Sequence, residues 1–521
     1  MNFASVSFLA DAPEISAPSR TPSHRRPAAP PPPAPAPTRL PDPVAESWPV
    51  AVLGVPFDPV TVGKTLSRLD AMIASRQPHY VVTANVDFLV QAHRDVELRR
   101  ILVEADLVLC DGTPLLWASR WLGNALPERV AGSDLAPALI ENAARKGHRI
   151  FFLGAGPGVA AAATEKLKQT HPALQIVGHY SPPFSALLEM DHAEITRQIR
   201  AARPDILLVS FGCPKQEKWI AMHYRALGVP VSIGVGATID FLAGRVPRAP
   251  DWMRRSGTEW LYRLIQEPRR LYKRYATDLA VFGPAFVLQR TRLSGGRARD
   301  RAPRLLPAPA AQWNHVDAGD ALTLAALRQT DEFWRALPLR NNHCLLDCSA
   351  VRTIDGTGVA FLLRWRKQLR AGGRQLVLLA PSRPLRRALA STRVADFFTM
   401  ADTVAAALRS AEISATQPPV LHDGAARALA WCDEIVAANT EEVWRLTTEH
   451  IQSFVAEGSS LIVIDLSKLR FVDSSGAGLM LRIKKWAQQF PAEVLFARPQ
   501  PNVHNVLRLT RLDGLLLEGA P

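Results

Sequence analysis

The chain has 521 residues, of which 47% are hydrophobic and 21% charged, so it is a globular protein too long for one hydrophobic core, and we expect two to four domains. It has no run of eighteen apolar residues, no secretory signal pattern, and five cysteines without a CxxC or Cys/His grouping. These features exclude a spanning helix, a disulfide framework and a structural metal, and they predict a cytoplasmic protein. The formal net charge of +14 indicates an acidic partner, whether nucleotide, nucleic acid or anionic lipid.

The N-terminal segment, residues 1–47, contains the run RRPAAPPPPAPAPTRLPDP. Proline and alanine in this proportion bury too little apolar surface to offset the entropy of the chain. We therefore expect a disordered or polyproline-like segment.

Residues 48–244 alternate short apolar strands with helical stretches. The predicted strands are VVTANVDFLV, DLVLCDG, RIFFLGAG, ILLVSFG and VSIGVGA, and most of them finish at Gly or Asp. This alternation predicts an α/β domain with a Rossmann-like parallel sheet that is covered by helices on both faces.

Polar residues follow these strands, beginning with Asp111 at the end of DLVLC. Ligands bind at the carboxyl ends of parallel strands, so Asp111 is either a reactive group or the first residue of a turn. The other groups that the same rule places at this edge are Thr83, Asn85, Asp87, Arg129, Asp134, Lys215, Gln216 and Glu217.

The GAGPGVA stretch opens a helix after a strand, and Gly154 and Gly156 either hold a diphosphate or simply form a tight turn. The α/β unit has no D-x-D pair, so we expect no metal and no other cofactor. Charge on a leaving group would instead be offset by Arg129, helix dipoles and backbone donors.

A basic, aromatic appendage occupies residues 245–290. Between Arg245 and Tyr275 it has nine lysines and arginines against three acidic residues, with tryptophans and tyrosines between them. Pro268 is expected to kink a helix or to start a second one. Residues 291–311 are rich in Gly, Pro and Arg and are predicted to be a linker.

The remaining residues form an internal duplication: a first copy at 312–410 and a second copy at 411–521. LLDCSAVRTIDGTGVAFLLRWRKQ in the first copy aligns with VIDLSKLRFVDSSGAGLMLRIKKW in the second. Asp355 pairs with Asp473, and every other matched pair has the same separation of 118 residues (473 − 355). Two gap-free α/β domains are therefore expected, each with a strand, a D-x-x-G turn, a helix and a further strand.

The motifs TANVDFL, ADLVLCDGTPLLWA, ERVAGSDL, FLGAGPG, FGCPKQEKW and GVGATIDFLAG resemble those of the WecG/TagA/CpsF family of bacterial glycosyltransferases. The resemblance implies inverting transfer of a hexose, of N-acetylmannosamine type or glucose or glucuronic acid, from a UDP-sugar to an undecaprenyl-diphosphate-linked sugar. Such a reaction belongs to exopolysaccharide or cell-envelope polysaccharide synthesis. The resemblance implies that Asp111 is the catalytic base. The positions it places in the donor pocket are Thr83, Asn85, Arg129, Gln216 and Asp240.

Two alternatives stay open within this assignment. For Asp111 the alternative is an Asx-type turn before Gly-Thr-Pro, which the shared sheet edge makes the weaker explanation. For Gln216 the alternative is a polar residue at a helix N-terminus, which explains it equally. A different class of protein also fits: a scaffold that senses a nucleotide sugar without turnover.

The appendage resembles the C-terminal segment by which this family reaches the inner face of the membrane. Arg263, Arg270 and Arg274 are candidates to contact the donor or lipid diphosphate. The alternative is an exposed basic helix on a linker. Nucleic acid is not an expected partner, because no recognition motif accompanies the charge.

The duplicated half resembles STAS domains, which suggests a regulatory role and a protein partner. In phosphorylatable members the second Ser of DSSG accepts phosphate, which corresponds to Ser475 and, in the first copy, to Thr357. The alternative for Ser475 is a helix cap. Neither copy has an evident catalytic set.

Overall fold

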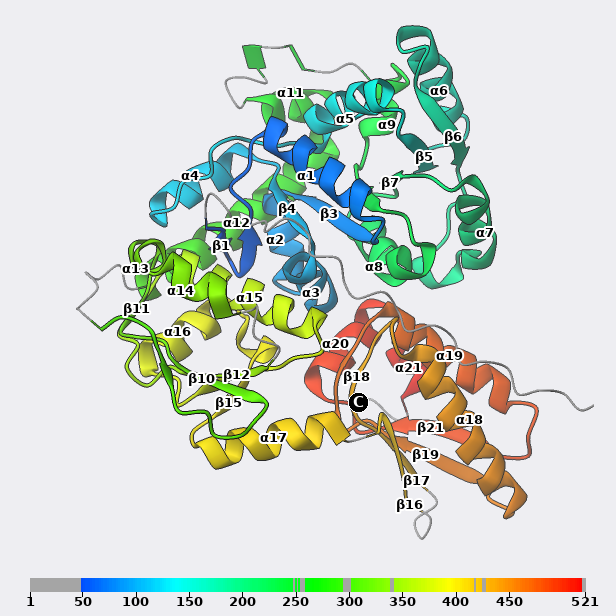
Figure 1. The fold of residues 1–521 in the computed structure, drawn as a ribbon. Helices are drawn as coiled ribbons and strands as arrows, with labels where there is room; N and C mark the ends of the chain where they lie inside the picture. Colours follow the sequence, from blue (N-terminus) through cyan, green and yellow to red (C-terminus); the bar gives the residue numbers. More distant parts are fainter. Residues whose placement is uncertain are drawn as a thin grey trace, which may run out of the picture. The chain divides into compact units, whose positions relative to one another are not determined.

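The structure is a computed structural model (Figure 1). The predicted disordered segment, residues 1–47, lies outside the residues that it describes. Among the described helices, none has both the length and the apolar character needed to span a bilayer. The described residues are 48–246, 249–250, 252–253, 258–293, 301–337, 342–416, 418–423 and 428–517.

A six-stranded sheet forms the first domain, and all its neighbouring strands are parallel. The sequence predicted five of these strands. The sixth, Gln175–Tyr180, lies at the edge of the sheet and carries polar residues, so a search for apolar runs missed it. In sheet order the strands are β4 (Leu107–Cys110), β3 (His79–Ala84), β8 (Val231–Gly234), β7 (Ile206–Ser210), β5 (Arg149–Gly154) and β6 (Gln175–Tyr180).

Helices cover both faces of this sheet (Figure 1). Tyr80 and Val82 belong to one hydrophobic core and Val81 to the other, because successive strand residues point to opposite faces. This arrangement confirms the predicted parallel sheet with two covered faces. One face packs on α3 (Val96–Glu104), α7 (His192–Ala202) and α8 (Lys215–Leu227), and the other on α1 (Val62–Ser75), α5 (Gly132–Lys146) and α6 (Val159–Thr170).

An antiparallel hairpin, β1 (Val50–Val52) and β2 (Val55–Phe57), precedes the sheet and is separate from it. All six strand residues are buried. The hairpin packs on helix α15 (Gly356–Ala371) of the first copy, where the rings of Trp48 and Phe361 meet edge to face at 5.5 Å. One hydrophobic core therefore runs from the sheet domain into the first copy.

Two helices, α11 (Glu259–Gln266) and α12 (Pro268–Arg292), form the described part of the appendage. Pro268 occupies the first turn of α12, where its missing N–H is not needed, which confirms the predicted start of a second helix. Helix α12 packs on α2 (Val86–Ala92). Near its end, the buried Gln289 makes two hydrogen bonds of 2.8 Å to the backbone of the β1–β2 hairpin.

The first copy contains a five-stranded sheet with four parallel strands and one antiparallel edge strand, β9 (Arg304–Leu306). These three residues lie inside the predicted linker, so the linker ends earlier than its composition indicated. Arg301 and Arg304 donate to the buried Asp317 and hold the segment against the sheet. The other elements are β10 (Trp313–Asp317), β11 (Ala321–Leu322), α13 (Leu324–Gln329), α14 (Asp331–Ala336), β12 (His343–Asp347), β13 (Thr353–Ile354), β14 (Leu376–Leu379), α16 (Arg383–Ser391), β15 (Thr399–Ala401) and α17 (Val404–Thr416).

The second copy repeats this plan around a separate hydrophobic core. In both copies an aspartate caps the helix after the D-x-x-G turn: Asp355 accepts from Thr357 and Gly358 N–H, and Asp473 accepts from Gly476 N–H. The shared cap confirms the duplication. The elements are β16 (Val420–Asp423), β17 (Ala428–Trp431), β18 (Asp433–Ile435), α18 (Thr440–Ala456), β19 (Leu461–Asp465), β20 (Leu469–Val472), α19 (Ser474–Ala487), β21 (Glu493–Ala497), α20 (Pro501–Leu509) and α21 (Asp513–Leu516).

Candidate functional site

The sheet order brings the carboxyl ends of β4, β3, β8, β7 and β5 side by side. Asp111 follows β4, and Asn85 follows β3 directly beside it. Asp240 lies in the short helix α9 (Thr238–Leu242) after β8, and Gln216 opens α8 after β7. Residues that are far apart in the sequence therefore share one edge, and this edge is the candidate active site.

Asp111 is half-buried, and its backbone N–H donates to Ala84 O of the neighbouring strand at 2.9 Å. Helix α4 (Thr113–Trp121) begins immediately afterwards, with Gly112 as an N-cap that has no side chain. A Cβ atom added at Gly112 would lie 3.8 Å from the Asn85 Cβ, so the two chain segments are in contact. The carboxylate is thus carried on a backbone that β3 holds in place.

Thr83 and Asn85 have structural partners at this edge. The buried Thr83 Oγ1 donates to Gly234 O at 3.3 Å, which links β3 to β8. Asn85 caps α2 by accepting from Phe88 N–H at 3.3 Å. Both side chains therefore fix the strand ends that surround Asp111.

Arg129 lies between two carboxylates. Its guanidinium contacts Asp134 at 2.6 Å and Glu259 at 3.2 Å. Glu259 is the first residue of α11, so this ion pair ties the appendage to the edge of the sheet. The arginine is placed where the sequence predicted it, but a diphosphate would have to compete with the two carboxylates for its N–H groups. Glu259 was not predicted as a site residue, although it lies in the appendage that resembles the C-terminal segment of the family.

Gln216 is 2% exposed and connects two turns of the sheet edge. Its Oε1 accepts from Gly212 N–H at 3.1 Å and from Gly236 N–H at 3.2 Å, while its Nε2 donates to Glu217 Oε1 at 2.7 Å. These bonds join the turns that follow β7 and β8, and the donor contact of Gln216 stays a prediction. Burial raises the pKa of the Glu217 carboxyl to about 7.

The glycines of GAGPG are explained by backbone geometry. Gly154 has φ +95°, and an added Cβ would lie 2.5 Å from Ser210 O of strand β7. Gly158, the N-cap of α6, also has a positive φ, whereas the space around Gly156 is less restricted. The tight-turn explanation therefore accounts for Gly154 without a ligand.

The appendage reaches the same edge through Arg274, which contacts Asp87 at 3.3 Å and Asp278 at 3.8 Å. Burial and the nearby Asp87 raise the pKa of Asp278 to about 6. Arg263 and Arg270 lie on α11 and α12, but their side chains are outside the described residues.

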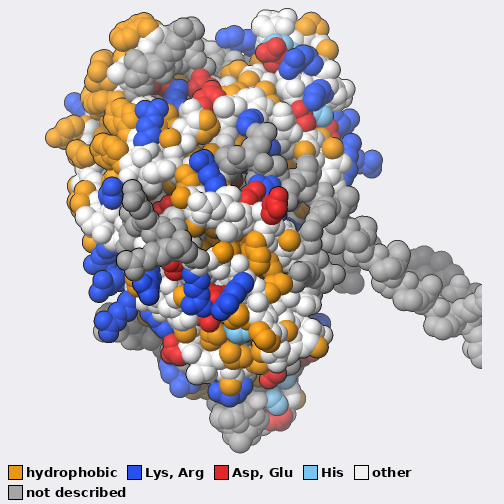
Figure 2. Space-filling view, turned by 60° about the vertical axis from the view of Figure 1, so that its left-hand side comes forward, with side chains coloured by type: hydrophobic (Ala, Val, Ile, Leu, Met, Phe, Trp, Pro, Cys, Tyr) orange, Lys and Arg blue, Asp and Glu red, His pale blue; other side chains and the backbone are white. Residues whose placement is uncertain are grey.

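Exposed apolar side chains lie on the appendage and on a neighbouring helix. They are found on α11 and α12 and also on α4, the helix that follows Asp111, where Trp121 contacts Phe286 of α12 at 6.0 Å between ring centroids. Figure 2 shows hydrophobic side chains beside Lys and Arg on one face of the molecule. The exposed members are Trp117, Trp121, Trp252, Trp260, Leu261, Ile265, Tyr272, Leu279, Val287 and Leu288.

The two copies contact the first domain with the same end of the same helix. In the first copy, Thr357 is fully buried, and its Oγ1 accepts from Asn124 Nδ2 at 3.1 Å. In the second copy, Ser474 N and Oγ donate to Glu97 of α3 at 2.5 and 2.8 Å. In this structure the buried Thr357 hydroxyl is not accessible to a kinase. Ser475, which follows Ser474 in the second copy, is half-buried.

Comparison with known proteins agrees with this architecture. A model of the glycosyl transferase WecG/TagA/CpsF family matches residues 50–296, and a model of the STAS domain matches residues 311–407 and 433–518. A curated protein of Bacillus subtilis is 34% identical over 212 residues, which cover 39% of this chain and 81% of that protein. The chain belongs to the WecG/TagA/CpsF family of glycosyltransferases.

This relative and the two that follow share one name, N-acetylglucosaminyldiphosphoundecaprenol N-acetyl-beta-D-mannosaminyltransferase. A protein of Bacillus spizizenii is 34% identical over 191 residues, covering 37% of this chain and 72% of its own length. One of Staphylococcus aureus is 28% identical over 224 residues, covering 43% of this chain and 86% of its own length. In this glycosyltransferase, two STAS domains follow the part that matches these relatives.

Within the described part of this WecG/TagA/CpsF chain, no group of three or more His, Cys, Asp or Glu residues is placed to hold a metal ion. The expectation of metal-independent transfer stays a prediction, which rests on the missing D-x-D pair and on the arginines at the sheet edge.

Proposed function

We propose that this enzyme transfers an N-acetylmannosamine-type hexose, or alternatively glucose or glucuronic acid, from a UDP-sugar to an undecaprenyl-diphosphate-linked sugar. The names of the relatives specify N-acetylmannosaminyl transfer to a diphosphoundecaprenol-linked acceptor, and they support this choice. The observation that carries the proposal is the position of Asp111 at the carboxyl end of β4, beside Asn85 and on the same edge as Asp240.

In the proposed reaction, Asp111 accepts the proton of the acceptor hydroxyl while that oxygen forms a bond to the anomeric carbon of the donor. The bond between that carbon and the diphosphate oxygen breaks with its electron pair, and UDP leaves with one more negative charge. Attack from the face opposite to the leaving group inverts the anomeric centre. In this proposal Arg129 offsets the charge on UDP once Glu259 or Asp134 releases it, and its position at the sheet edge supports this role.

The acceptor is fixed in a membrane, so the enzyme has to reach the lipid surface from the inner, cytoplasmic face. Exposed tryptophans and tyrosines favour the headgroup region, and each Lys or Arg near an anionic leaflet adds about 1 kcal/mol of attraction. These residue types are combined on α4, α11 and α12. We propose this face as the membrane-docking surface.

We assign the STAS pair a regulatory role. Its two helix ends touch the catalytic domain at Asn124 and Glu97, so a change in either contact would be transmitted to the elements that follow β4 and β3. Phosphate on Ser475 would add negative charge one residue from the Ser474–Glu97 contact and would weaken it by repulsion.

The decisive experiment measures UDP release from a panel of UDP-sugars, with a short-chain polyprenyl-diphosphate N-acetylglucosamine as acceptor. We expect acceptor-dependent release from one donor, and a loss of about 100-fold or more in Asp111→Asn with donor affinity unchanged. Asp402→Asn is the matched control, because that carboxylate lies on the first STAS domain with a side chain 84% exposed. Full turnover in Asp111→Asn would show that Asp111 is not the catalytic base and that it only forms a turn. Donor binding without turnover in the wild type would favour a nucleotide-sugar sensor.

A further inference from the structure

A cavity of about 270 Å³ lies where the catalytic domain meets both STAS domains. Helix α3 contributes one wall, the first STAS domain a second, and strands β18 and β20 with the start of α20 of the second STAS domain a third. Small-molecule sites generally occupy ~300–1,000 Å³. The cavity is close to the lower end of this range, so it is suited to a small ligand and not to a folded protein.

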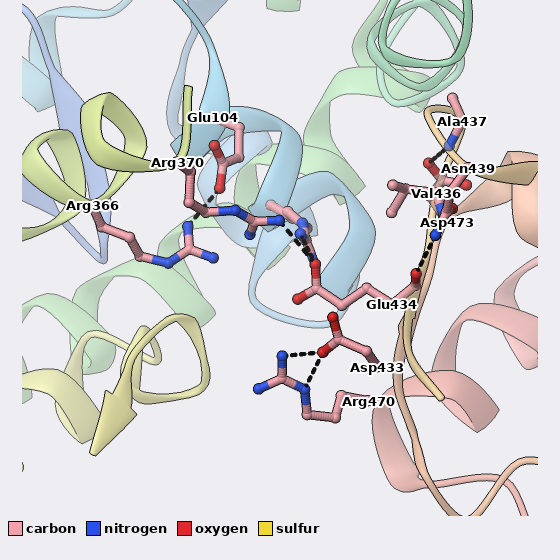
Figure 3. Close-up of polar contacts among 11 residues, drawn as sticks. Glu104, Arg366, Arg370, Asp433, Glu434, Val436, Ala437, Asn439, Arg470 and Asp473 are labelled. Atoms are coloured by element: carbon pink, nitrogen blue, oxygen red, sulfur yellow. Dashed lines mark hydrogen bonds and ion pairs between the residues drawn. The ribbon is translucent and has the colours of Figure 1, made fainter. Parts of the chain in front are cut away.

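The walls of this cavity are strongly basic. Five arginines line it, from all three domains, against two carboxylates, Asp396 and Glu434. Three of the arginines are neutralised by carboxylates: Arg100 by Glu434 at 2.6 Å, Arg366 by Glu104 at 2.7 Å, and Arg470 by Asp433. Figure 3 shows how these ion pairs converge between α3, α15 and β18. The five lining arginines are Arg99, Arg100, Arg366, Arg393 and Arg470.

Arg99 and Arg393 differ from the other three, because within the described chain neither forms an ion pair with a carboxylate. Arg99 is 9% exposed and donates only to the backbone carbonyls of Ala92, His93 and Arg393. Arg393 is exposed and donates through one nitrogen to His93 O at 2.8 Å. A guanidinium has five N–H donors, so Arg393 retains several that no acceptor among the described residues takes up.

Two guanidinium groups side by side repel each other. Burial and the neighbouring Arg393 lower the pKa of Arg99 to about 10. A bound anion would relieve this repulsion, and it would accept the remaining N–H groups. Phosphate suits the arrangement because its oxygens accept two parallel bonds from each planar guanidinium.

We propose that this cavity is an effector site for a small molecule that carries a phosphate or diphosphate group. Arg99 and Arg393 bind the phosphate oxygens, and Arg470 on the second STAS domain contacts them from the opposite wall. Gln500 and Asn502 provide amide groups for the rest of the ligand. None of these residues belongs to the candidate active site, and the proposal does not depend on the identity of the transferred sugar.

Occupation of the cavity would affect how the three domains are held together. Arg99 lies on α3, the same helix that presents Glu97 to Ser474. A ligand bridging Arg99, Arg393 and Arg470 would favour the arrangement in which the second STAS domain contacts the catalytic domain. Binding of a cellular phosphate compound in this cavity would thus regulate the enzyme by stabilising the contact between its catalytic domain and the second STAS domain.

The internal duplication supplies a matched control for the test. Arg511 of the second STAS domain corresponds to Arg393, and both follow a threonine, are exposed and have a left-handed backbone, with φ +59° and +55°. Arg511 is not a lining residue of the cavity. Arg393→Gln and Arg511→Gln therefore make the same chemical change in the same backbone setting.

The experiment titrates the full chain, at low salt, with inorganic diphosphate and with GDP by calorimetry. We expect binding of at least one probe by the wild type, weakened about tenfold or more in Arg393→Gln and unchanged within about twofold in Arg511→Gln. Arg470→Gln, with Arg352→Gln as its counterpart in the first STAS domain, repeats the test from the other wall.

Binding that is equal in Arg393→Gln and Arg511→Gln would place the anion elsewhere, for example in the donor pocket, and would overturn the proposal. Absence of binding by both probes would overturn it as well. Diphosphate binding without GDP binding would support a site limited to the phosphate group, whereas tighter binding of GDP would show that the ligand is a nucleotide.

Discussion

At the scale of single residues, several side chains at the candidate active site hold backbone in place. Gln216 and Thr83 connect neighbouring strand ends, and Asn85 caps α2. Each bond removes freedom from a loop next to Asp111. The geometry of the proposed catalytic carboxylate therefore depends on residues that need not touch the substrate.

Glu217 predicts a pH dependence of stability. Burial raises the pKa of its carboxyl from 4.5 to about 7 in the folded protein. Between about pH 4.5 and 7 the unfolded chain releases this proton while the folded protein retains it, so the stabilisation present at low pH is lost as the pH rises. Glu217→Gln has no carboxyl at this position, so its stability does not decrease with this titration. The melting temperature of the variant minus that of the wild type is therefore expected to increase from pH 5 to pH 8. A difference in melting temperature that stays constant with pH would show that the pKa of Glu217 is not raised by folding.

At the scale of elements, the proposed membrane-docking surface extends beyond the appendage. Helix α4 begins next to Asp111 and carries Trp117 and Trp121, which are 53% and 66% exposed. The ring contact between Trp121 and Phe286 joins this helix to α12. Helix α4, which begins two residues after the candidate catalytic residue, thus extends the exposed apolar surface of the appendage.

The double variant Trp117→Ser/Trp121→Ser tests this extension. Loss of two interfacial tryptophans is expected to weaken binding to vesicles containing anionic lipid by about tenfold or more, as measured by sedimentation. Phe184→Ser is the control, because this aromatic side chain is fully exposed but lies outside α4, α11 and α12. Equal effects of the two changes would indicate non-specific adsorption.

At the scale of the whole molecule, the sequence predicted the parts but not their docking. The sheet, the duplication and the placement of Asp111 all follow from local patterns of apolar residues and turns. The pairing of Arg129 with Glu259 and that of Glu97 with Ser474 join positions 130 and 377 residues apart. No local pattern encodes such contacts, because each residue has the same appearance in the sequence whether it faces solvent or another domain.

Lys367 tests the docking of the first STAS domain. Its Nζ contacts Asp106 at 2.6 Å, and Lys367 and His79 hold the pKa of that half-buried carboxyl far below its usual range. Lys367→Met leaves the carboxylate without its main partner and is expected to lower the free energy of unfolding by about 3 kcal/mol in denaturant titrations. Lys485→Met, the same change at the equivalent exposed position of the second STAS domain, is expected to be neutral within about 0.5 kcal/mol. Similar losses for both variants would contradict the docking.

The continuous core between the β1–β2 hairpin and helix α15 has a consequence for how the duplicated domains have diverged. Separating the first STAS domain would expose Trp48, Phe361 and the apolar residues around them to water. We therefore expect this domain to stay docked on the catalytic domain. The second has its own core, on which Val96 and Leu188 of the catalytic domain pack, and it also contacts that domain through the buried Ser474–Glu97 hydrogen bond. Duplication has thus produced one domain that shares its core with the catalytic domain and one that keeps a core of its own.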